Sequence, residues 1–342
     1  MRAIVRLARP KFLLYSWVLW SLGTAFAAVE GATLDFQAYL SGLMFTWCAH
    51  LATHFCNEYF DQAADAANPA PTRWTGGSRI LVEGLLEPQT ACAAAFVLLF
   101  VSLGLALVMP MPARAYAFAA VTLGWFYTAP PFQLNYRGFG ELTVATVLNL
   151  LVPSCAFALQ AESHAPELVV LMVPAFLVQC VRMMVMNLAD YEGDRQVGKR
   201  TSVVRLGPRR AAIAHAVGQA TAYGLVVAMA VMGSFPTPAA LAILCTAPLA
   251  VWQSARVLAG VNDPDRANSV AFVASTHVAL VIAATYAGVL FGAGARLWYL
   301  WLPLAALGIA LAIQTRRELT GVAVAGRAPA PEARAGGPDA AP

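Results

Sequence analysis

The sequence predicts an all-α, polytopic membrane protein. Of its 342 residues, 59% are hydrophobic and only 12% are charged, and the mean hydropathy is +0.64. Soluble domains carry about 25% charged residues. Long apolar blocks alternate with short charged loops, and about 20 residues of α-helix are long enough to cross the bilayer core. This composition excludes a soluble Rossmann enzyme and a secreted disulfide scaffold. Because the net charge is only +4 and no basic patch is interleaved with aromatic residues, a nucleic-acid partner is excluded too.

Ten membrane-crossing helices are expected from the apolar runs between charged, proline and glycine breaks. The first run has a basic flank and lacks a small-residue cleavage site, so we interpret it as a retained helix rather than a signal peptide. The ten predicted spans are 12–29, 36–58, 91–109, 114–131, 141–160, 167–187, 210–233, 238–258, 268–291 and 296–314.

The basic residues predict the orientation of these helices. If the N-terminus is cytoplasmic, then only Arg114 and Arg296 among the 22 Lys and Arg residues lie on the outer side. Basic loops stay on the cytoplasmic side, so both termini and the even-numbered connections are expected to face the cytoplasm. Residues 1–318 form the predicted transmembrane domain. The Ala/Pro/Gly-rich segment 319–342 is predicted to be a disordered cytoplasmic tail.

A first group of oxygen-bearing side chains follows the second predicted helix. Asn57, Asp61 and Asp65 stand four residues apart, so they form a column on one face of a helix. A single column of this kind is most often a solvated helix end. Its significance therefore depends on what else lies on the same side of the membrane.

A second column, formed by Asn187, Asp190 and Asp194, follows the sixth predicted helix. Four spans separate the two columns, so both are expected at the cytoplasmic face. Two facing carboxylate columns repel each other unless cations lie between them, and Mg²⁺ accepts carboxylate and amide oxygens together with substrate phosphate. Carboxylates, Mg²⁺ and basic side chains together indicate a diphosphate site. The basic residues that follow the columns are Arg73, Arg79, Arg195, Lys199 and Arg200.

Other polar residues are predicted inside the helices. His50 and His54 lie one turn apart, and without a cysteine or a third histidine on the same helix face they indicate a polar cavity lining rather than a transition-metal site. Gln179 and Arg182 lie within the sixth predicted span. An arginine at membrane depth needs a partner, which either a substrate or a column carboxylate can supply.

Four stretches carry a resemblance to the UbiA superfamily of intramembrane prenyltransferases. They are NEYFDQAAD at 57–65, TGGSRILVEGLLEP at 75–88, YTAPPFQLNYRGFGE at 127–141 and DYEGDRQVGKRTSVVRLG at 190–207. The likeness spans residues 10–292, and the last two stretches are most similar to the 1,4-dihydroxy-2-naphthoate branch, which makes menaquinone. The resemblance implies a ring of nine transmembrane helices around a central cavity, with the tenth helix as a C-terminal addition.

The resemblance also implies an activity, Mg²⁺-dependent transfer of an isoprenyl group from a prenyl diphosphate to an aromatic, lipoquinone-type acceptor within the bilayer. Glu58 stands where many members of the superfamily have aspartate. Tyr127 and Arg137 are expected near the reacting centre. The implied metal ligands are Asn57, Asp61, Asp65, Asp190 and Asp194, and the implied diphosphate-binding residues are Asn57, Arg73, Arg79, Asn187, Lys199 and Arg200.

Two other functions remain open at this point. A terpene cyclase of the same superfamily ionises the same diphosphate without an aromatic acceptor. A secondary transporter or divalent-cation carrier also places carboxylates near membrane helices, although its charges usually lie near the midplane on broken helices.

Overall fold

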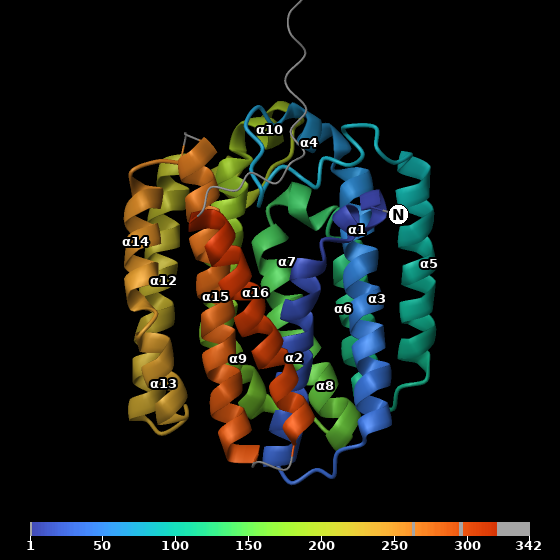
Figure 1. Cartoon of the computed structure of the whole chain (residues 1–342), viewed down its shortest axis with the longest axis vertical. Coiled ribbons are helices and arrows are strands. Elements are labelled where there is room, and N and C mark those ends of the chain that lie inside the picture. The colour runs from blue at the N-terminus through green and yellow to red at the C-terminus, as the bar shows by residue number, and fades with distance from the viewer. Residues whose placement is uncertain (1, 262–263, 294–296, 320–342) are drawn as a thin grey trace, which may run out of the picture.

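The computed structural model describes residues 2–261, 264–293 and 297–319, and all regular secondary structure in these ranges is helical (Figure 1). The predicted C-terminal tail lies almost entirely outside the described residues. Helices lie at each of the ten predicted ranges. They are α2 (Pro10–Val29), α3 (Phe36–Phe60), α5 (Pro88–Leu107), α6 (Ala113–Trp125), α7 (Gly140–Thr146) continued by η2 (Val147–Leu151) and α8 (Val152–Ala161), α9 (Pro166–Ala189), α12 (Pro208–Val231), α13 (Thr237–Leu244) with α14 (Ala247–Leu258), α15 (Pro264–Ala293) and α16 (Leu302–Leu319).

The chain is an integral membrane protein. Eight helical segments of its described part are long and apolar enough to cross a bilayer. The 25-residue α3 and the 13-residue α6 are not among these eight, but they stand beside them in the same bundle (Figure 1). The all-α membrane fold is therefore confirmed, whereas the number of ten crossings stays a prediction.

Proline and glycine positions explain how these helices begin and pack. Helices α2, α5, α9 and α12 each start at a proline, whose missing N–H is not needed in the first helical turn. Gly23 of α2 lies directly against α8, because a Cβ placed there would come within 2.0 Å of the Pro153 carbonyl oxygen. Small residues allow such close backbone approach between membrane helices.

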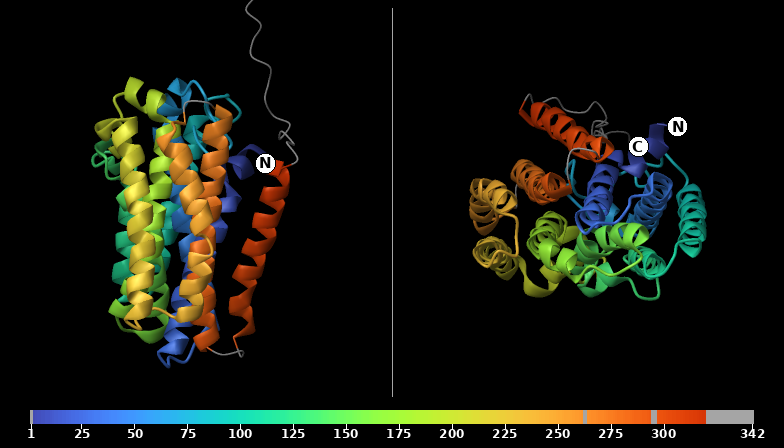
Figure 2. Two further views of the ribbon diagram at one scale, coloured as in Figure 1. Left: turned by 90° about the vertical axis from the view of Figure 1, so that its left-hand side faces the viewer. Right: turned by 90° about the horizontal axis from the view of Figure 1, so that it is seen from below.

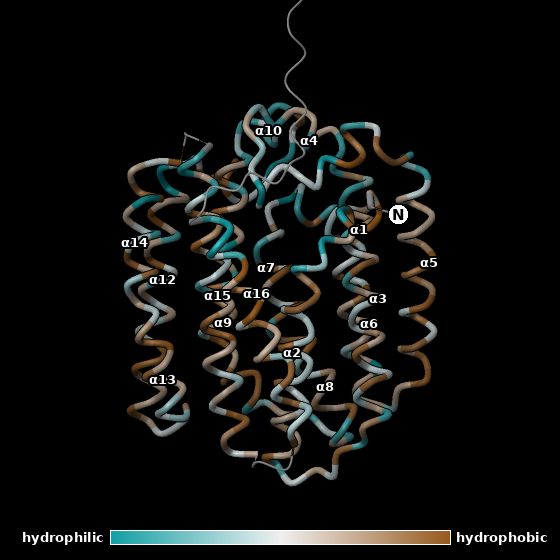
Figure 3. The backbone as a smooth tube through the Cα atoms, in the orientation of Figure 1, coloured by the Kyte–Doolittle hydropathy of each residue, from teal (hydrophilic) through white to brown (hydrophobic). Residues whose placement is uncertain are grey.

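The end-on view shows α16 at the outside of the bundle, where it packs against α2 and α15 (Figure 2). Short helices gather at one end of the bundle, which we call the α4/α10 end. Hydrophilic residues concentrate there, while the rest of the bundle is largely hydrophobic (Figure 3). The short elements are α1 (Arg2–Ala8), α4 (Gln62–Ala67), η1 (Leu134–Arg137), α10 (Tyr191–Gln196) and α11 (Ser202–Leu206) at this end, and η3 (Trp298–Trp301) before α16.

The helices α4 and α10 lie side by side, although more than 120 residues separate them in sequence (Figure 1). Gly193 of α10 makes this approach possible. A Cβ at Gly193 would lie 2.9 Å from the Asn68 backbone nitrogen and 3.1 Å from the Ala64 carbonyl oxygen. Because these neighbours are backbone atoms, they cannot move aside as a flexible side chain would.

We therefore expect Gly193→Ala to force α4 and α10 apart and to destabilise the protein by about 1–3 kcal/mol, the usual cost of overpacking. Thermal unfolding of the purified protein in detergent measures this change. Gly104→Ala in α5 is the matched control, because nothing lies within 4 Å of the added methyl group. Equal stability of the two variants would contradict the close contact between α4 and α10.

Candidate active site

A cavity of about 230 Å³ lies within the bundle and reaches the α4/α10 end. Its wall combines polar side chains from both predicted columns with apolar side chains of α3, α6, α7 and η2. The predicted site residues that line it are Asn57, Asp61, Asp65, Tyr127, Asn187, Asp190 and Lys199.

The first column continues across a break between two helices. Helix α3 ends at Phe60, and Asp61 joins it to α4, which carries Asp65. The Asn57 amide nitrogen donates a hydrogen bond to Asp61 Oδ2 at 2.7 Å. The side chains of Asn57 and Asp61 therefore hold each other in place at the α4/α10 end of the cavity.

The second column is arranged in the same way around the junction of α9 and α10, where Asp190 separates the two helices. Its first member is fixed by a neighbouring helix, since Asn187 donates to Glu141 Oε1 of α7 at 2.8 Å. Ser202 donates to the same Glu141 oxygen. Glu141 thus ties α7, α9 and α11 together beneath the second column.

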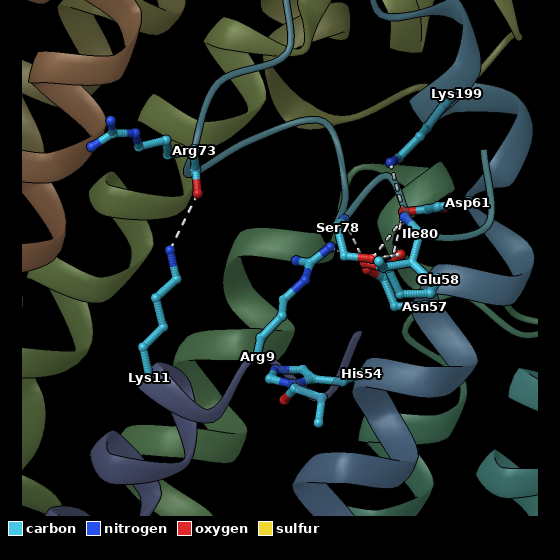
Figure 4. A network of polar contacts seen from close by, with 11 residues as sticks. Arg9, Lys11, His54, Asn57, Glu58, Asp61, Arg73, Ser78, Ile80 and Lys199 are labelled. Atoms are coloured by element: carbon cyan, nitrogen blue, oxygen red, sulfur yellow. Dashed lines mark hydrogen bonds and ion pairs between the residues drawn. The ribbon is translucent and has the colours of Figure 1, made fainter. Parts of the chain in front are cut away.

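Lys199 joins the two columns. Its ammonium nitrogen lies 3.1 Å from Asp61 Oδ2 and 3.3 Å from Asp194 Oδ1, and the contact with Asp61 is visible in Figure 4. Lys199 is only 6% exposed. A second bridge runs from the Asn68 amide nitrogen to Asp190 Oδ1 at 2.7 Å. The structure therefore brings the two columns to the same end of the bundle, with a cation between them.

The carboxylates also retain unused oxygen atoms. Among the described residues, Asp61 Oδ1 and Asp194 Oδ2 are buried and have no hydrogen-bond partner. Within the described residues, no three His, Cys, Asp or Glu side chains form a complete metal site on their own. Mg²⁺ commonly takes one or two carboxylates and completes its shell with water and substrate phosphate. The donor set therefore fits a metal ion that is shared with a phosphate-bearing substrate.

The loop that follows α4 folds back over the first column. Ser78 donates from its backbone nitrogen and its hydroxyl to Glu58 at 2.8 and 2.6 Å, and Arg9 forms an ion pair with the same carboxylate (Figure 4). Glu58 is therefore fully engaged by protein groups. Gly77 adopts a φ of +74°, and a Cβ there would lie 1.9 Å from Asp65 Oδ2, so only glycine permits this loop conformation.

The predicted basic residues are divided between buried and exposed positions. Arg79 is partly buried and donates to the backbone carbonyl of Asp65. Arg73, Arg137 and Arg200 are exposed and do not line the cavity. Arg73 pairs with Glu318 at 3.3 Å, and Arg137 donates to the Pro131 carbonyl at 2.9 Å. The roles of these three residues stay predictions.

Some cavity residues were missed by the sequence analysis. Arg9 was interpreted only as part of the basic N-terminal flank, yet it lines the cavity and pairs with Glu58. Asn68, which does not line the cavity but donates to Asp190, was missed too, although its position three residues after Asp65 was a signal in the sequence. His50 and His54 do line the cavity, with ring nitrogens 3.1 Å from Ser16 Oγ and 3.0 Å from the Ala8 carbonyl, as expected for a polar lining.

The proximity of these charges shifts several pKa values. Burial and the nearby charge of Asp194 raise the pKa of Asp190 to about 7. Burial raises the pKa of Asp194 to about 6, with Lys199 opposing the shift and Asp61 adding to it. Burial acts to lower the pKa of Lys199, but the charges of Asp61 and Asp194 outweigh this effect and raise it. For both Asp190 and Asp194, burial and repulsion between the carboxylates therefore outweigh the attraction of Lys199.

Comparison with known proteins points to one family. The profile of the UbiA prenyltransferase family matches residues 18–276. The 1,4-dihydroxy-2-naphthoate octaprenyltransferase of Bacillus subtilis is 25% identical, over 67% of this chain and 74% of that protein. The enzyme of the same name from Escherichia coli is 27% identical, over 61% of this chain and 70% of its own length.

A solved structure has the same fold. The UbiA homolog from Archaeoglobus fulgidus, bound to GPP and Mg²⁺, superimposes with a TM-score of 0.56 over 84% of this chain and 99% of its own, at 19% identity.

The raised pKa values predict how stability depends on pH when divalent ions are removed. In the folded state, the pKa values of Asp190 and Asp194 lie above the ordinary value of 3.8. Both carboxylates therefore bind protons more tightly in the folded state than in the unfolded state. The folded state therefore holds more protons than the unfolded state between about pH 4 and pH 7, so stability falls as the pH rises through this range. We expect the unfolding temperature in EDTA to fall over this range, and Asp190→Asn to flatten the dependence.

Asp265→Asn is the control for this measurement, because Asp265 is exposed at the start of α15. It should keep the pH dependence of the unmodified protein. A dependence that Asp190→Asn leaves unchanged would show that Asp190 is not the group that titrates.

Proposed function

This chain belongs to the UbiA prenyltransferase family, and from that premise we propose that it transfers an isoprenyl group from a prenyl diphosphate to an aromatic acceptor, with Mg²⁺ as cofactor. The observation that carries the proposal is the convergence of Asp61 and Asp194 on Lys199 above an apolar cavity. Charged groups for a diphosphate and an apolar space for an isoprenyl chain are thus adjacent.

The diphosphate of the donor is assigned to the α4/α10 end of the cavity. Bound Mg²⁺ would neutralise the charge that develops on the leaving diphosphate. The residues proposed to hold Mg²⁺ are Asn57, Asp61, Asp65, Asp190 and Asp194, and those proposed to contact phosphate are Asn57, Arg73, Arg79, Asn187, Lys199 and Arg200.

Lys199 is the best-placed basic residue for this role. It is buried, lines the cavity and already faces two carboxylates. Hydrogen bonds from a buried ammonium to an oxyanion act in a low-dielectric site, where they stabilise developing charge more strongly than in water. The exposed Arg73 and Arg200 need a movement of their side chains to reach the same phosphate.

The part of the cavity away from the α4/α10 end is proposed to protect the allylic cation, which forms when the donor loses its diphosphate. Val144, Val147 and Leu148 line it on the side of α7 and η2, and apolar walls exclude the water that would otherwise hydrolyse the cation. Each buried CH₂ of the isoprenyl chain contributes about 0.8 kcal/mol. Tyr127 is proposed to lie beside the reacting carbon, since it is buried and lines the same cavity. Arg137 is proposed to act near the same centre.

The acceptor is proposed to be of the lipoquinone type, and 1,4-dihydroxy-2-naphthoate is the candidate. The names of two relatives support this choice. The distribution of basic residues supports an orientation in which the α4/α10 end and both termini face the cytoplasm of the cell.

Asp61→Asn and Asp190→Asn are expected to lower the rate of prenyl transfer by at least about 100-fold, the usual effect of removing one preorganised charge-stabilising group. Mass spectrometry of the product, with the purified protein, prenyl diphosphate, Mg²⁺ and dihydroxynaphthoate, measures the rate. Omission of Mg²⁺ should have an equal effect.

Asp265→Asn again serves as the control and should retain the full rate. Undiminished transfer by both site variants would contradict the assigned roles. A hydrocarbon or alcohol formed from the donor alone would indicate cyclisation instead, and ion flux without diphosphate release would indicate a transporter.

A further inference from the structure

Arg182 is a buried charge on the cavity wall. It lies in the membrane helix α9, lines the cavity and is only 9% exposed. Its Nε donates to Ser275 Oγ at 3.2 Å, and its guanidinium lies 5.6 Å from the Phe12 ring. No ion pair joins Arg182 to an acidic side chain in the described part of the chain. A buried charge without a counter-ion is destabilising, so its retention here calls for an anion.

The column carboxylates do not supply that anion. Among the described residues, Asp61 and Asp194 form their ion pairs with Lys199 rather than with Arg182, and Asp190 accepts a hydrogen bond from Asn68. Arg182 also precedes Asp190 by eight residues on α9, which places it about 12 Å deeper along the helix axis. The sequence allowed either a substrate or a column carboxylate as the partner of Arg182, and the substrate is therefore the one that remains.

A second donor lies beside Arg182. Gln179 precedes it by three residues, so the two side chains share a face of α9, and both line the cavity. Gln179 is 2% exposed, and its amide nitrogen has no hydrogen-bond partner in the part of the chain that the structure describes. Two buried donors that point into one cavity and lack an acceptor form a site for an anionic group.

The chemistry of the two substrates decides which one this site binds. An isoprenyl chain has no hydrogen-bond acceptor, and the diphosphate belongs to the α4/α10 end. Only the aromatic acceptor remains for the deeper site. Phe12 and His54, whose ring centroids are 5.8 Å apart, also line the cavity and provide flat walls for an aromatic ring.

We propose that Arg182 and Gln179 bind a carboxylate group of the aromatic acceptor, and that the enzyme therefore selects aromatic carboxylates. This inference rests on the proposed function. The carboxylate is held at the Arg182 end, so that the ring extends from there toward the diphosphate. Arg182 is a binding and specificity residue for the acceptor, and it takes no part in binding the donor.

The test compares two acceptors that differ only in the carboxylate, 1,4-dihydroxy-2-naphthoate and 1,4-dihydroxynaphthalene. Arg182→Met, which keeps an unbranched apolar stem and removes the charged guanidinium, should raise the KM for the naphthoate by about 10- to 100-fold, the range expected for lost hydrogen bonds to a charged group. The KM values for the prenyl diphosphate and for dihydroxynaphthalene should not change. Gln179→Leu should raise the KM for the naphthoate by a smaller factor.

Two further variants control for folding. Arg182→Lys keeps the charge and should restore much of the affinity for the naphthoate. Arg209→Met removes an exposed arginine at the start of α12 and should leave all three KM values unchanged. An Arg182→Met variant that weakens both acceptors equally, or that weakens the donor, would overturn the proposed carboxylate site.

Binding without turnover separates this inference from the proposed function. Quenching of tryptophan fluorescence by the naphthoate in the absence of donor reports binding, because Trp74 lines the cavity. If neither acceptor is prenylated but Arg182→Met abolishes naphthoate binding, then the proposed function is wrong and the carboxylate site stands. If the naphthoate is prenylated and binds equally well to Arg182→Met, then the carboxylate site is wrong and the proposed function stands.

Discussion

A single buried cation links the two halves of the polar site. Lys199 contacts Asp61 from the segment after α3 and Asp194 from the segment after α9. Removing one partner of a buried ion pair typically destabilises a protein by about 3–5 kcal/mol, because the remaining charge is left uncompensated. The two columns therefore depend on Lys199 for their approach, and they still carry unpaired oxygens that suit a further cation.

The surrounding chain makes this arrangement possible through small residues and amide bridges. Gly193 lets α10 approach the backbone at Asn68, and Gly77 lets the loop after α4 pass over Asp65. Asn68 then connects this loop to Asp190. The polar end of the protein is thus held by direct contacts between short helices, while the long helices provide the apolar walls of the cavity.

Hydropathy and spacing were sufficient to predict where the long helices lie and which residues belong to each column. They did not predict that each column crosses a helix break, at Asp61 and at Asp190. They did not predict every helix end. The predicted span 114–131 includes an apolar segment after Trp125, where α6 ends. Hydropathy extended the span because residues 126–129 are mostly apolar, whereas the chain turns there and continues into Pro130 and Pro131, which cannot propagate a helix.

The partners of the charged residues were harder to predict. Spacing along a helix shows which side chains share a face, but it does not show which residue from a distant segment faces them. Lys199 and Arg200 were therefore equivalent in the sequence, yet one is buried between carboxylates and the other is exposed. Arg9 and Glu58 likewise form a pair that only the tertiary fold reveals.

The central claim is that the two columns bind one diphosphate together. The most direct test is a double-mutant cycle for the affinity of Mg²⁺-pyrophosphate, with Asp61→Asn, Asp194→Asn and the combined variant. Side chains that share a ligand should show a coupling free energy of about 1 kcal/mol or more. If the loss of binding free energy in the combined variant equals the sum of the two single losses to within about 0.5 kcal/mol, then the two columns act at separate sites, which would contradict the claim.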